Sequence, residues 1–178
     1  MISAMRDPAS GPVASVPLWQ RVIVGKNPKV TLVRALLLGV GCWLVFRHVL
    51  LPVRVNGISM EPTLRNGSVN LVNRVPYLWR EPRRGEIVAI RTTGTSIMYL
   101  KRIIALPSES VEVQRGEVWI DGQLLDEPYS REAEPWEIER RTLGPEDYFV
   151  MGDNRTMPKE LHWGGVIKRS RIVGNTLW

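Results

Sequence analysis

The sequence is poor in the two residue types that most often bind metals or act as nucleophile and base. It contains one cysteine and two histidines among 178 residues. Cys42 has no second cysteine with which to form an intramolecular disulfide, a thiolate metal site or a dithiol mechanism. His48 and His162 are the only histidines. A serine nucleophile elsewhere in the chain would therefore need a base of another kind.

Acidic residues are nearly absent from the N-terminal part of the chain. Residues 1–53 contain six Lys/Arg and one Asp, whereas residues 54–178 contain eighteen Lys/Arg and seventeen Asp/Glu. The overall net charge of +6 is thus concentrated at one end. A nucleic-acid-binding domain would carry its basic excess on a folded face. The distribution therefore does not favour nucleic acid as a partner.

An apolar run follows this basic end. Ala35 to Phe46 are twelve uncharged residues within the mainly apolar stretch 30–53, and about twenty such residues cross a bilayer. Arg34 and Arg47 lie towards the two ends, where long side chains can reach the interface. We predict a transmembrane helix over 30–53. The alternatives are a buried core helix and a cleaved signal peptide, but no A-x-A motif follows the run.

The charges around this span predict its orientation. Five basic residues precede or begin the span: Arg6, Arg21, Lys26, Lys29 and Arg34. The positive-inside rule then places the N-terminus in the cytoplasm. We expect a cytoplasmic leader over 1–29 and an extracytoplasmic domain over 54–178.

The sequence of the expected extracytoplasmic domain, residues 54–178, is typical of a β-rich fold. β-branched and aromatic residues, separated by Gly and Pro, predict strands in 85–92, 96–106, 110–125 and 147–153. Asp121–Gly122 suits the two-residue type I′ turn of a hairpin. No segment after residue 54 has a long helical period, and the charged stretch 131–141 is expected to be an exposed loop. The expected fold class is mainly β, with one N-terminal transmembrane helix before an all-β domain.

The stretch "VNGISMEPTLRNG" (55–67) contains a candidate nucleophile, Ser59. A serine hydroxyl needs an adjacent base, and lysine is an established alternative to histidine. Lys101 would share a strand face with Tyr99, Ile103 and Ala105. Desolvation on such a face lowers the pKa of a lysine and allows the neutral amine to accept a proton. The alternatives are an ordinary turn at Ser59 and a strand-edge lysine paired with a glutamate.

Five motifs occur in one order after the predicted span. They are "GISMEPTL" (57–64), "RRGEIVAI" (83–90), "YLKRIIALPSESVEV" (99–113), "VWIDGQLLDEPY" (118–129) and "YFVMGDNR" (148–155). In combination they resemble the type I signal peptidase family, the membrane-anchored Ser-Lys proteases that cut signal peptides from exported proteins. The resemblance runs from about Val30 to Gly174.

This resemblance implies roles for individual residues. Ser59 matches the family nucleophile and Lys101 its general base, in an all-β catalytic domain against the outer membrane surface. The neutral lysine would take the serine proton, and an acyl-enzyme would form and be hydrolysed. The Ser59 N–H is the expected oxyanion donor, since Gly57 offers no hydroxyl. An extended substrate would add as a strand beside the Ser59 segment or Tyr99–Lys101.

The resemblance also implies partners and a location. Signal peptides of preproteins and the lipid bilayer are the expected partners, with no cofactor, metal or nucleic acid. The expected location is the bacterial cytoplasmic membrane, with the mitochondrial inner membrane as the alternative.

The segment after "GDNR" departs from the family, which commonly continues with S-x-D-S-R. Pro158, Glu160 and His162 stand at the serine, aspartate and arginine positions. Pro158 has no hydroxyl to orient Lys101, so the lysine is expected to be held by packing from its strand neighbours, a backbone carbonyl, a water, or a hydroxyl such as Thr156. His162 is expected to be a partly exposed loop residue.

Three further residues are expected to support the site. Arg102, Asp153 and Arg155 are predicted to form structural ion pairs or to orient the lysine. Two other functions are alternatives to an active peptidase. A non-enzymatic relative would need a disabled site, yet both Ser59 and Lys101 are present. A self-cleaving repressor-type regulator would carry a DNA-binding helix-turn-helix and an Ala-Gly or Cys-Gly cleavage site, and the sequence has neither.

Overall fold

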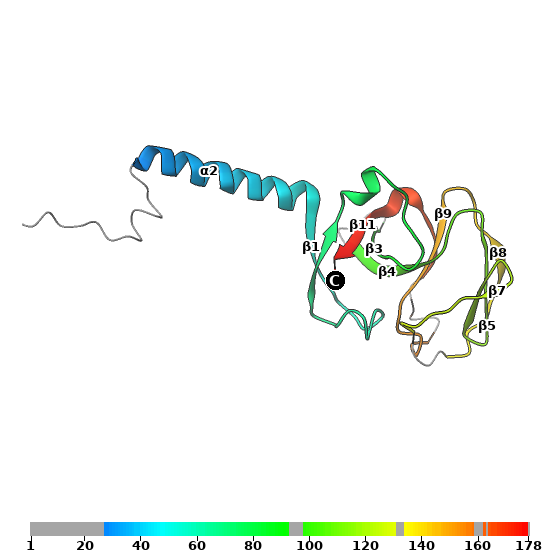
Figure 1. Ribbon diagram of the computed structural model, residues 1–178. Coiled ribbons are helices and arrows are strands. Elements are labelled where there is room, and N and C mark those ends of the chain that lie inside the picture. Colours follow the sequence, from blue (N-terminus) through cyan, green and yellow to red (C-terminus); the bar gives the residue numbers. More distant parts are fainter. Residues whose placement is uncertain (1–26, 93–97, 131–133, 159–161, 163, 178) are drawn as a thin grey trace, which may run out of the picture. The chain divides into compact units, whose positions relative to one another are not determined.

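The computed structural model describes residues 27–92, 98–130, 134–158, 162 and 164–177. It comprises two compact units, Met1–Trp43 and Leu44–Trp178. The expected leader lies almost wholly outside the described residues. Figure 1 shows the described elements along the chain.

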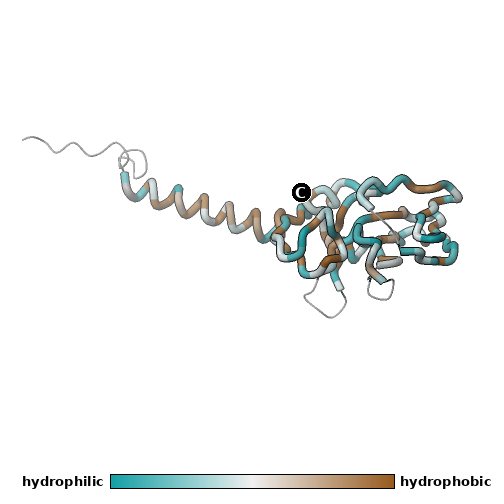
Figure 2. The backbone as a smooth tube through the Cα atoms, turned by 90° about the horizontal axis from the view of Figure 1, so that it is seen from below, coloured by the Kyte–Doolittle hydropathy of each residue, from teal (hydrophilic) through white to brown (hydrophobic). Residues whose placement is uncertain are grey.

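The described part of the first unit is helical. Helix α2 (Pro28–Leu44) leads into a π-helical turn η1 (Val45–Val49). Together Lys29–Val49 form 21 residues of mean hydropathy 1.8, long and apolar enough to cross a membrane, and this window buries none of its residues. Figure 2 shows apolar residues along the length of this helix. Its side chains are left without a protein core, as expected for a helix whose surroundings are lipid.

The predicted end of the span at residue 53 was wrong. The helical segment ends at Val49, and Leu50–Arg54 form strand β1, which pairs with β2 from Leu50↔Asn73 to Arg54↔Val69. Pro52 disfavours helical backbone at the residue before it and lacks the N–H that a helix requires. An apolar run of this kind looks the same in a membrane helix and in the strand that follows it.

The second unit is built from antiparallel sheets. A seven-stranded sheet has the order β1-β2-β11-β3-β4-β9-β10, and a four-stranded sheet has the order β7-β6-β5-β8. The remaining strands are β2 (Val69–Asn73), β3 (Ile87–Arg91), β4 (Met98–Ala105), β5 (Ser110–Gln114), β6 (Glu117–Ile120), β7 (Gln123–Leu124), β8 (Ile138–Thr142), β9 (Asp147–Met151), β10 (Gly165–Lys168) and β11 (Ile172–Leu177). Two 3₁₀ turns, η2 (Pro76–Leu78) and η4 (Arg169–Arg171), complete the described elements. The predicted fold class is confirmed.

The predicted hairpin is also present. Ile120 pairs with Gln123, and the two residues between them have positive φ values, 50° at Asp121 and 79° at Gly122. A type I′ turn requires positive φ at both positions, which explains the Asp-Gly pair. A second tight turn at Arg115–Gly116 divides the expected long strand into β5 and β6.

The expected loop over 131–141 was only partly correct. Residues 131–133 lie outside the described part, but Ile138–Thr142 form strand β8, which pairs with β5. Most of β8 is exposed because it is an edge strand whose charged side chains face water. Backbone pairing needs no apolar alternation, so charge alone did not exclude a strand. Trp136, just before it, is buried in the core.

Two core clusters bear on the candidate site. In the first, Ile104, Phe149 and Met151 of the large sheet pack with Val111 and Val118 of the small sheet, so the two sheets share one core. In the second, Met60 and Leu64 pack with Leu100 and Ile87. Burying each such side chain contributes about 1.5–3 kcal/mol. These contacts anchor the turn around Ser59 on the sheet that carries Lys101.

Candidate active site

Ser59 lies in a turn that its own backbone holds. The Glu61 N–H donates to the Ile58 carbonyl at 3.0 Å, and the Leu64 N–H donates to the Met60 carbonyl at 2.9 Å. Ser59 itself is half-buried. Within the part of the chain that the structure describes, its N–H donates to no acceptor. That N–H is therefore available to a substrate oxygen.

The "GDNR" loop ties this turn to the large sheet. The Asn154 N–H donates to the Ser59 carbonyl at 3.1 Å, and Asn154 Nδ2 donates to the Ile58 carbonyl at 3.1 Å. The Thr63 hydroxyl donates to Asp153 Oδ2 at 2.5 Å. The turn is thus held at its backbone and at one side chain. Residues that are about ninety positions apart in the sequence are brought together in this way.

Lys101 is buried, with 1% of its surface exposed. Desolvation lowers the pKa of its amine to about 8, and the nearby Asp153 carboxylate opposes this shift. The sequence-based expectation of a desolvated lysine on strand β4 is therefore supported by its position. A substantial fraction of the amine is neutral near neutral pH, in contrast to an exposed lysine.

Gly152 is the point where the candidate groups meet. A methyl group placed on its Cα would lie 2.2 Å from the Ser59 carbonyl oxygen, 2.5 Å from His162 Nε2 and 3.2 Å from Lys101 Nζ. No side chain fits between them, so this position requires glycine. Among the described residues, no hydrogen bond joins the Ser59 hydroxyl to the Lys101 amine in this structure. Gly152 is the first residue of the motif "GDNR", and the motif alone indicated no role for it.

Arg102, Asp153 and Arg155 each belong to a buried ion pair. Arg102 donates from Nε to Asp153 Oδ1 at 2.8 Å and from Nη2 to Oδ2 at 2.6 Å. Arg155 pairs with Glu127 and also donates from Nε to the Gly152 carbonyl at 2.9 Å. Both pairs therefore brace the loop that holds Ser59. Glu127 was missed because nothing local in "LLDEPY" shows that its carboxylate faces a distant arginine.

His162 corrects one expectation. It is buried, with 7% exposed, rather than partly exposed. Its Nε2 accepts a hydrogen bond from the Gly152 N–H at 3.1 Å, and its ring packs on Trp136 at a centroid distance of 4.5 Å. Burial, together with the charges of Lys101 and Arg155, lowers the pKa of His162 to about 3. The neutral ring and the Ser59 carbonyl thus both lie beside Gly152.

The expected substitute hydroxyl does not reach the lysine. Thr156 is exposed, and its hydroxyl donates to Asn154 Oδ1 at 2.7 Å. Pro158 is exposed as well, and Glu160 lies outside the described residues. The structure therefore brings Ser59, Lys101 and His162 together around Gly152 but leaves Thr156 outside this group.

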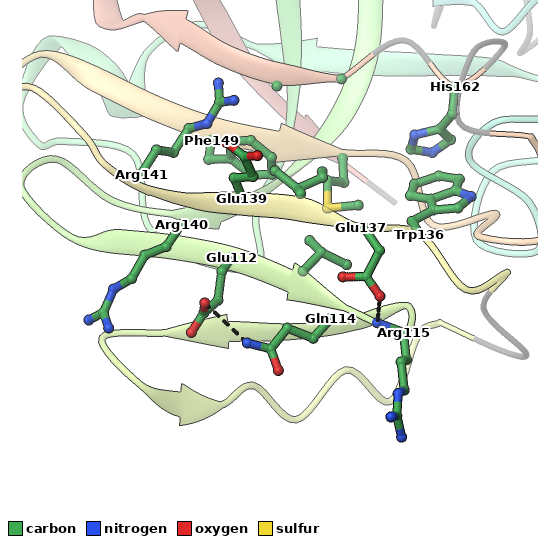
Figure 3. Close-up of a pocket in the computed structure, with 15 residues that line it drawn as sticks. Glu112, Gln114, Arg115, Trp136, Glu137, Glu139, Arg140, Arg141, Phe149 and His162 are labelled. Atoms are coloured by element: carbon green, nitrogen blue, oxygen red, sulfur yellow. Dashed lines mark hydrogen bonds between the residues drawn. The ribbon is translucent and has the colours of Figure 1, made fainter.

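Two pockets adjoin the site. A small one of about 40 Å³ is lined by Ser59 and by residues of two chain segments, Val53–Met60 without Ile58, and Met98–Leu100. A larger one of about 800 Å³ lies between β5, β8 and β9. Figure 3 shows the rings of Trp136 and His162 together at one end of the larger pocket. Only the small pocket includes the candidate nucleophile.

The site combines groups that could take part in acyl transfer. A serine hydroxyl, a desolvated lysine and an unengaged backbone N–H are the parts that acyl transfer requires. In the described ranges, no group of three or more His, Cys, Asp or Glu side chains could hold a metal ion.

Comparison with known proteins gives consistent matches. A family model described as signal peptidase, peptidase S26, matches residues 29–178. The chain is 36% identical over 155 residues to signal peptidase I T of Bacillus subtilis, with 80% of each chain covered. A signal peptidase I of Bacillus amyloliquefaciens matches with the same identity, length and coverage.

Two further matches are shorter. A probable signal peptidase I-2 of Synechocystis sp. is 34% identical over 122 residues, which is 65% of this chain but only 56% of that protein. A crystal structure of a signal peptidase I from Enterococcus faecalis shares 26% identity. It covers 56% of this chain and 98% of that chain, with a TM-score of 0.43.

Proposed function

Because the chain belongs to the signal peptidase family, peptidase S26, we propose that it removes signal peptides from exported preproteins with a Ser59–Lys101 dyad. The observation that carries the dyad is the buried Lys101 amine, which meets the backbone of Ser59 at Gly152. Catalytic hydrogen bonds are often long without substrate and tighten in the complex. The proposal requires that a movement of the Ser59 hydroxyl or of the lysine side chain bring the two groups within hydrogen-bonding distance.

The reaction proceeds by acyl transfer. Neutral Lys101 accepts the proton of Ser59 as the serine oxygen attacks the scissile carbonyl carbon. The resulting ammonium donates a proton to the leaving amine, and the acyl group stays on Ser59. Lys101, neutral again, then takes a proton from the water that attacks the ester carbonyl carbon. The ester bond to Ser59 breaks, the lysine ammonium returns its proton to the Ser59 oxygen, and the acid product leaves. The Ser59 N–H stabilises the oxyanion in both steps.

The small pocket supports selectivity for small side chains. Its volume of about 40 Å³ suits a residue no larger than a few heavy atoms beside the scissile bond. Its walls come from the Val53–Gly57 segment and from β4. Strand β9 pairs with β4 only from Arg102 to Ala105, so it does not cover the edge of β4 beside Leu100. An extended substrate segment laid between these two walls would add as a strand.

The helix supports a single-pass anchor. In this proposal residues 1–28 form a cytoplasmic leader, Lys29–Val49 cross the membrane, and the domain from Leu50 onward lies outside. Basic residues before the span favour this orientation. The relatives named above are bacterial proteins, which favours the bacterial cytoplasmic membrane over the mitochondrial inner membrane.

The decisive experiment is cleavage of a model preprotein by the full-length protein in detergent. Wild type should release a mature product cut after a small residue, identified by mass spectrometry. Ser59→Ala and Lys101→Ala should abolish product formation, whereas Ser170→Ala, at an exposed serine outside the site, should retain it. If Ser59→Ala kept the wild-type rate at the same cleavage position, another nucleophile would have to act.

Topology needs a separate measurement. A reporter that is active only outside the cytoplasm, fused after Trp178, should be active. Activity of the matched cytoplasmic reporter instead would overturn the orientation and, with it, the proposed class of substrate.

A further inference from the structure

A basic pocket lies where the helical segment ends and shares no lining residue with the small pocket of Ser59. Its volume is about 230 Å³. Its lining comprises three residues with cationic or N–H donor side chains and four with aromatic or aliphatic side chains: His48, Arg74, Arg169, Tyr77, Leu78, Ile172 and Val173. No carboxylate is among these lining residues. The pocket therefore combines donors suited to an anion with an apolar wall.

The positive charge of this pocket is incompletely neutralised. Among the described residues, Arg74 has no carboxylate or carbonyl partner for its guanidinium. Arg169 pairs with Glu81, but that carboxylate is 72% exposed, where water screens the interaction. Arg169 also lies 5.4 Å from the centre of the Tyr77 ring and donates from Nη2 to the Tyr77 carbonyl at 3.2 Å, an uncharged acceptor. Neighbouring Arg80, in contrast, is neutralised by the partly buried Glu86.

The chain places this pocket at the end of the span. Val49 is the last residue of the helical segment long enough to cross a bilayer. The Arg74 N–H donates to the Val49 carbonyl at 2.9 Å, and the next pair along is Leu50↔Asn73. A residue bonded to the end of a membrane span lies at the depth of the lipid headgroups.

Two exposed apolar side chains adjoin the pocket. Leu78, part of its lining, is 73% exposed, and the next residue, Trp79, is 84% exposed. Tryptophan is favoured at the membrane–water interface, where its ring meets the lipid and its N–H meets water. Water is an unfavourable environment for both side chains, and an interface would cover them.

We propose that this pocket binds the phosphate of an anionic phospholipid headgroup in the bilayer that the helix crosses. It is called the headgroup pocket below. Arg74 and Arg169 donate to the phosphate oxygens, since guanidinium groups match phosphate geometry. Leu78 and Trp79 contact the acyl-chain boundary beside it. The proposal rests on the membrane anchoring proposed above and is independent of the chemistry at Ser59.

The test is retention of lipid by the full-length protein in a neutral detergent, read by native mass spectrometry. Phosphatidylglycerol and phosphatidylcholine are supplied at equal concentration. Wild type should retain phosphatidylglycerol in preference, and Arg74→Gln should lower that preference about fivefold, the size expected for one basic residue at an anionic surface. Arg141→Gln, at an exposed arginine of strand β8, is the matched control and should leave it unchanged.

Three outcomes would overturn the proposal. Wild type could retain both lipids equally, or Arg141→Gln could lower the preference as much as Arg74→Gln does. Inorganic phosphate at millimolar concentration could also displace the lipid fully, which would make the site one for free phosphate. A Leu78→Ser, Trp79→Ser double variant should weaken retention of both lipids alike, which separates the apolar contact from the headgroup contact. Since no substrate is present, a failure of the proposed cleavage activity would leave this result intact.

Discussion

Lys101 and Arg102 are neighbours on strand β4, but their cationic groups have different surroundings: Arg102 has a direct counter-ion and Lys101 has none in the described parts of the chain. Both are buried, with 1% and 5% of their surfaces exposed. Arg102 donates twice to Asp153, once to the Gly85 carbonyl at 2.6 Å, and lies 3.9 Å from the centre of the Tyr129 ring. Lys101 has no hydrogen bond or ion pair among the described residues.

The difference shows how one strand carries both a scaffold and a base. For Arg102, direct bonds to a buried carboxylate and a carbonyl compensate the cost of burial, and a guanidinium stays protonated in any case. For Lys101, only the more distant attraction of Asp153 opposes desolvation, so desolvation prevails and its pKa falls to about 8. Asp153 thus fixes the loop through Arg102 and, more weakly, limits how far the lysine pKa falls.

Replacing Lys101 by an arginine, the residue type of its neighbour Arg102, should have the largest effect on the rate of cleavage. Lys101→Arg replaces the base with a group that stays protonated at any usable pH. We expect the rate of preprotein cleavage to fall about a thousandfold, as for loss of a general base, and as far as it does in Lys101→Ala. Lys168→Arg, at an exposed lysine paired with Asp147, is the control and should retain the wild-type rate. A Lys101→Arg rate near wild type would mean that lysine is not the base.

Removing the Asp153 carboxylate should change both the free energy of unfolding and the pKa of Lys101. Asp153→Asn leaves Arg102 buried without its counter-ion, which should cost about 3 kcal/mol in the free energy of unfolding. It also removes the attraction that raises the Lys101 pKa, so the pH midpoint of activity should move down. Chemical denaturation and a pH–rate profile measure the two effects.

Glu127→Gln is the matched control for this variant. It breaks the other buried pair, with Arg155, and should lower stability without moving the pH midpoint. Equal shifts of the midpoint in both variants would mean that general loosening of the fold, rather than the Asp153 charge, sets the lysine pKa.

The pH dependence of the wild type should reflect Lys101 alone. Below its pKa of about 8, the neutral fraction of the amine rises about tenfold per pH unit. The value of kcat/KM should therefore rise about fiftyfold from pH 6 to pH 8, gain about another twofold above pH 8, and then level off. His162, with a pKa of about 3, is neutral throughout this range and adds no step. A midpoint near 6.5 instead would assign the base to a histidine.

Local chemistry made part of this site predictable. Alternation along 96–106 predicted that Lys101 would lie among apolar side chains. In the rest of the fold, the Asp121–Gly122 pair predicted the tight turn between β6 and β7. Both are properties of a few consecutive residues, because strand faces repeat every two positions and type I′ turns need positive φ. The order of motifs supplied the pairing of Ser59 with Lys101, which spacing alone left open.

The unpredicted features depend on contacts between distant segments. His162 is buried because its partners are Gly152, ten residues earlier, and Trp136, in the charged stretch that precedes strand β8. Neither segment has a periodicity that reveals this packing. The change from helix to strand at Val49–Leu50 is set by pairing with β2, and the apolar character of the run continues through it.

The smallest expected changes in kcat are those of variants at His162 and Thr156. They test which of the two residues helps to position Lys101. His162→Ala removes the acceptor of the Gly152 N–H and the ring packed on Trp136. The "GDNR" loop, which contacts both Ser59 and Lys101, loses about one hydrogen bond. We therefore expect kcat to fall about tenfold with little change in KM. Thr156→Val should stay within about twofold of wild type, because the hydroxyl of this exposed threonine bonds to the Asn154 side-chain oxygen rather than to the lysine.

His162→Phe distinguishes the two contributions of the imidazole. Phenylalanine can keep the packing against Trp136 but leaves the buried Gly152 N–H without an acceptor. If the hydrogen bond positions the loop, His162→Phe should lower kcat as far as His162→Ala does while retaining more of its thermal stability. Recovery of the full rate in His162→Phe would assign the role to packing instead. A loss in Thr156→Val larger than in His162→Ala would restore Thr156 as the residue that orients Lys101.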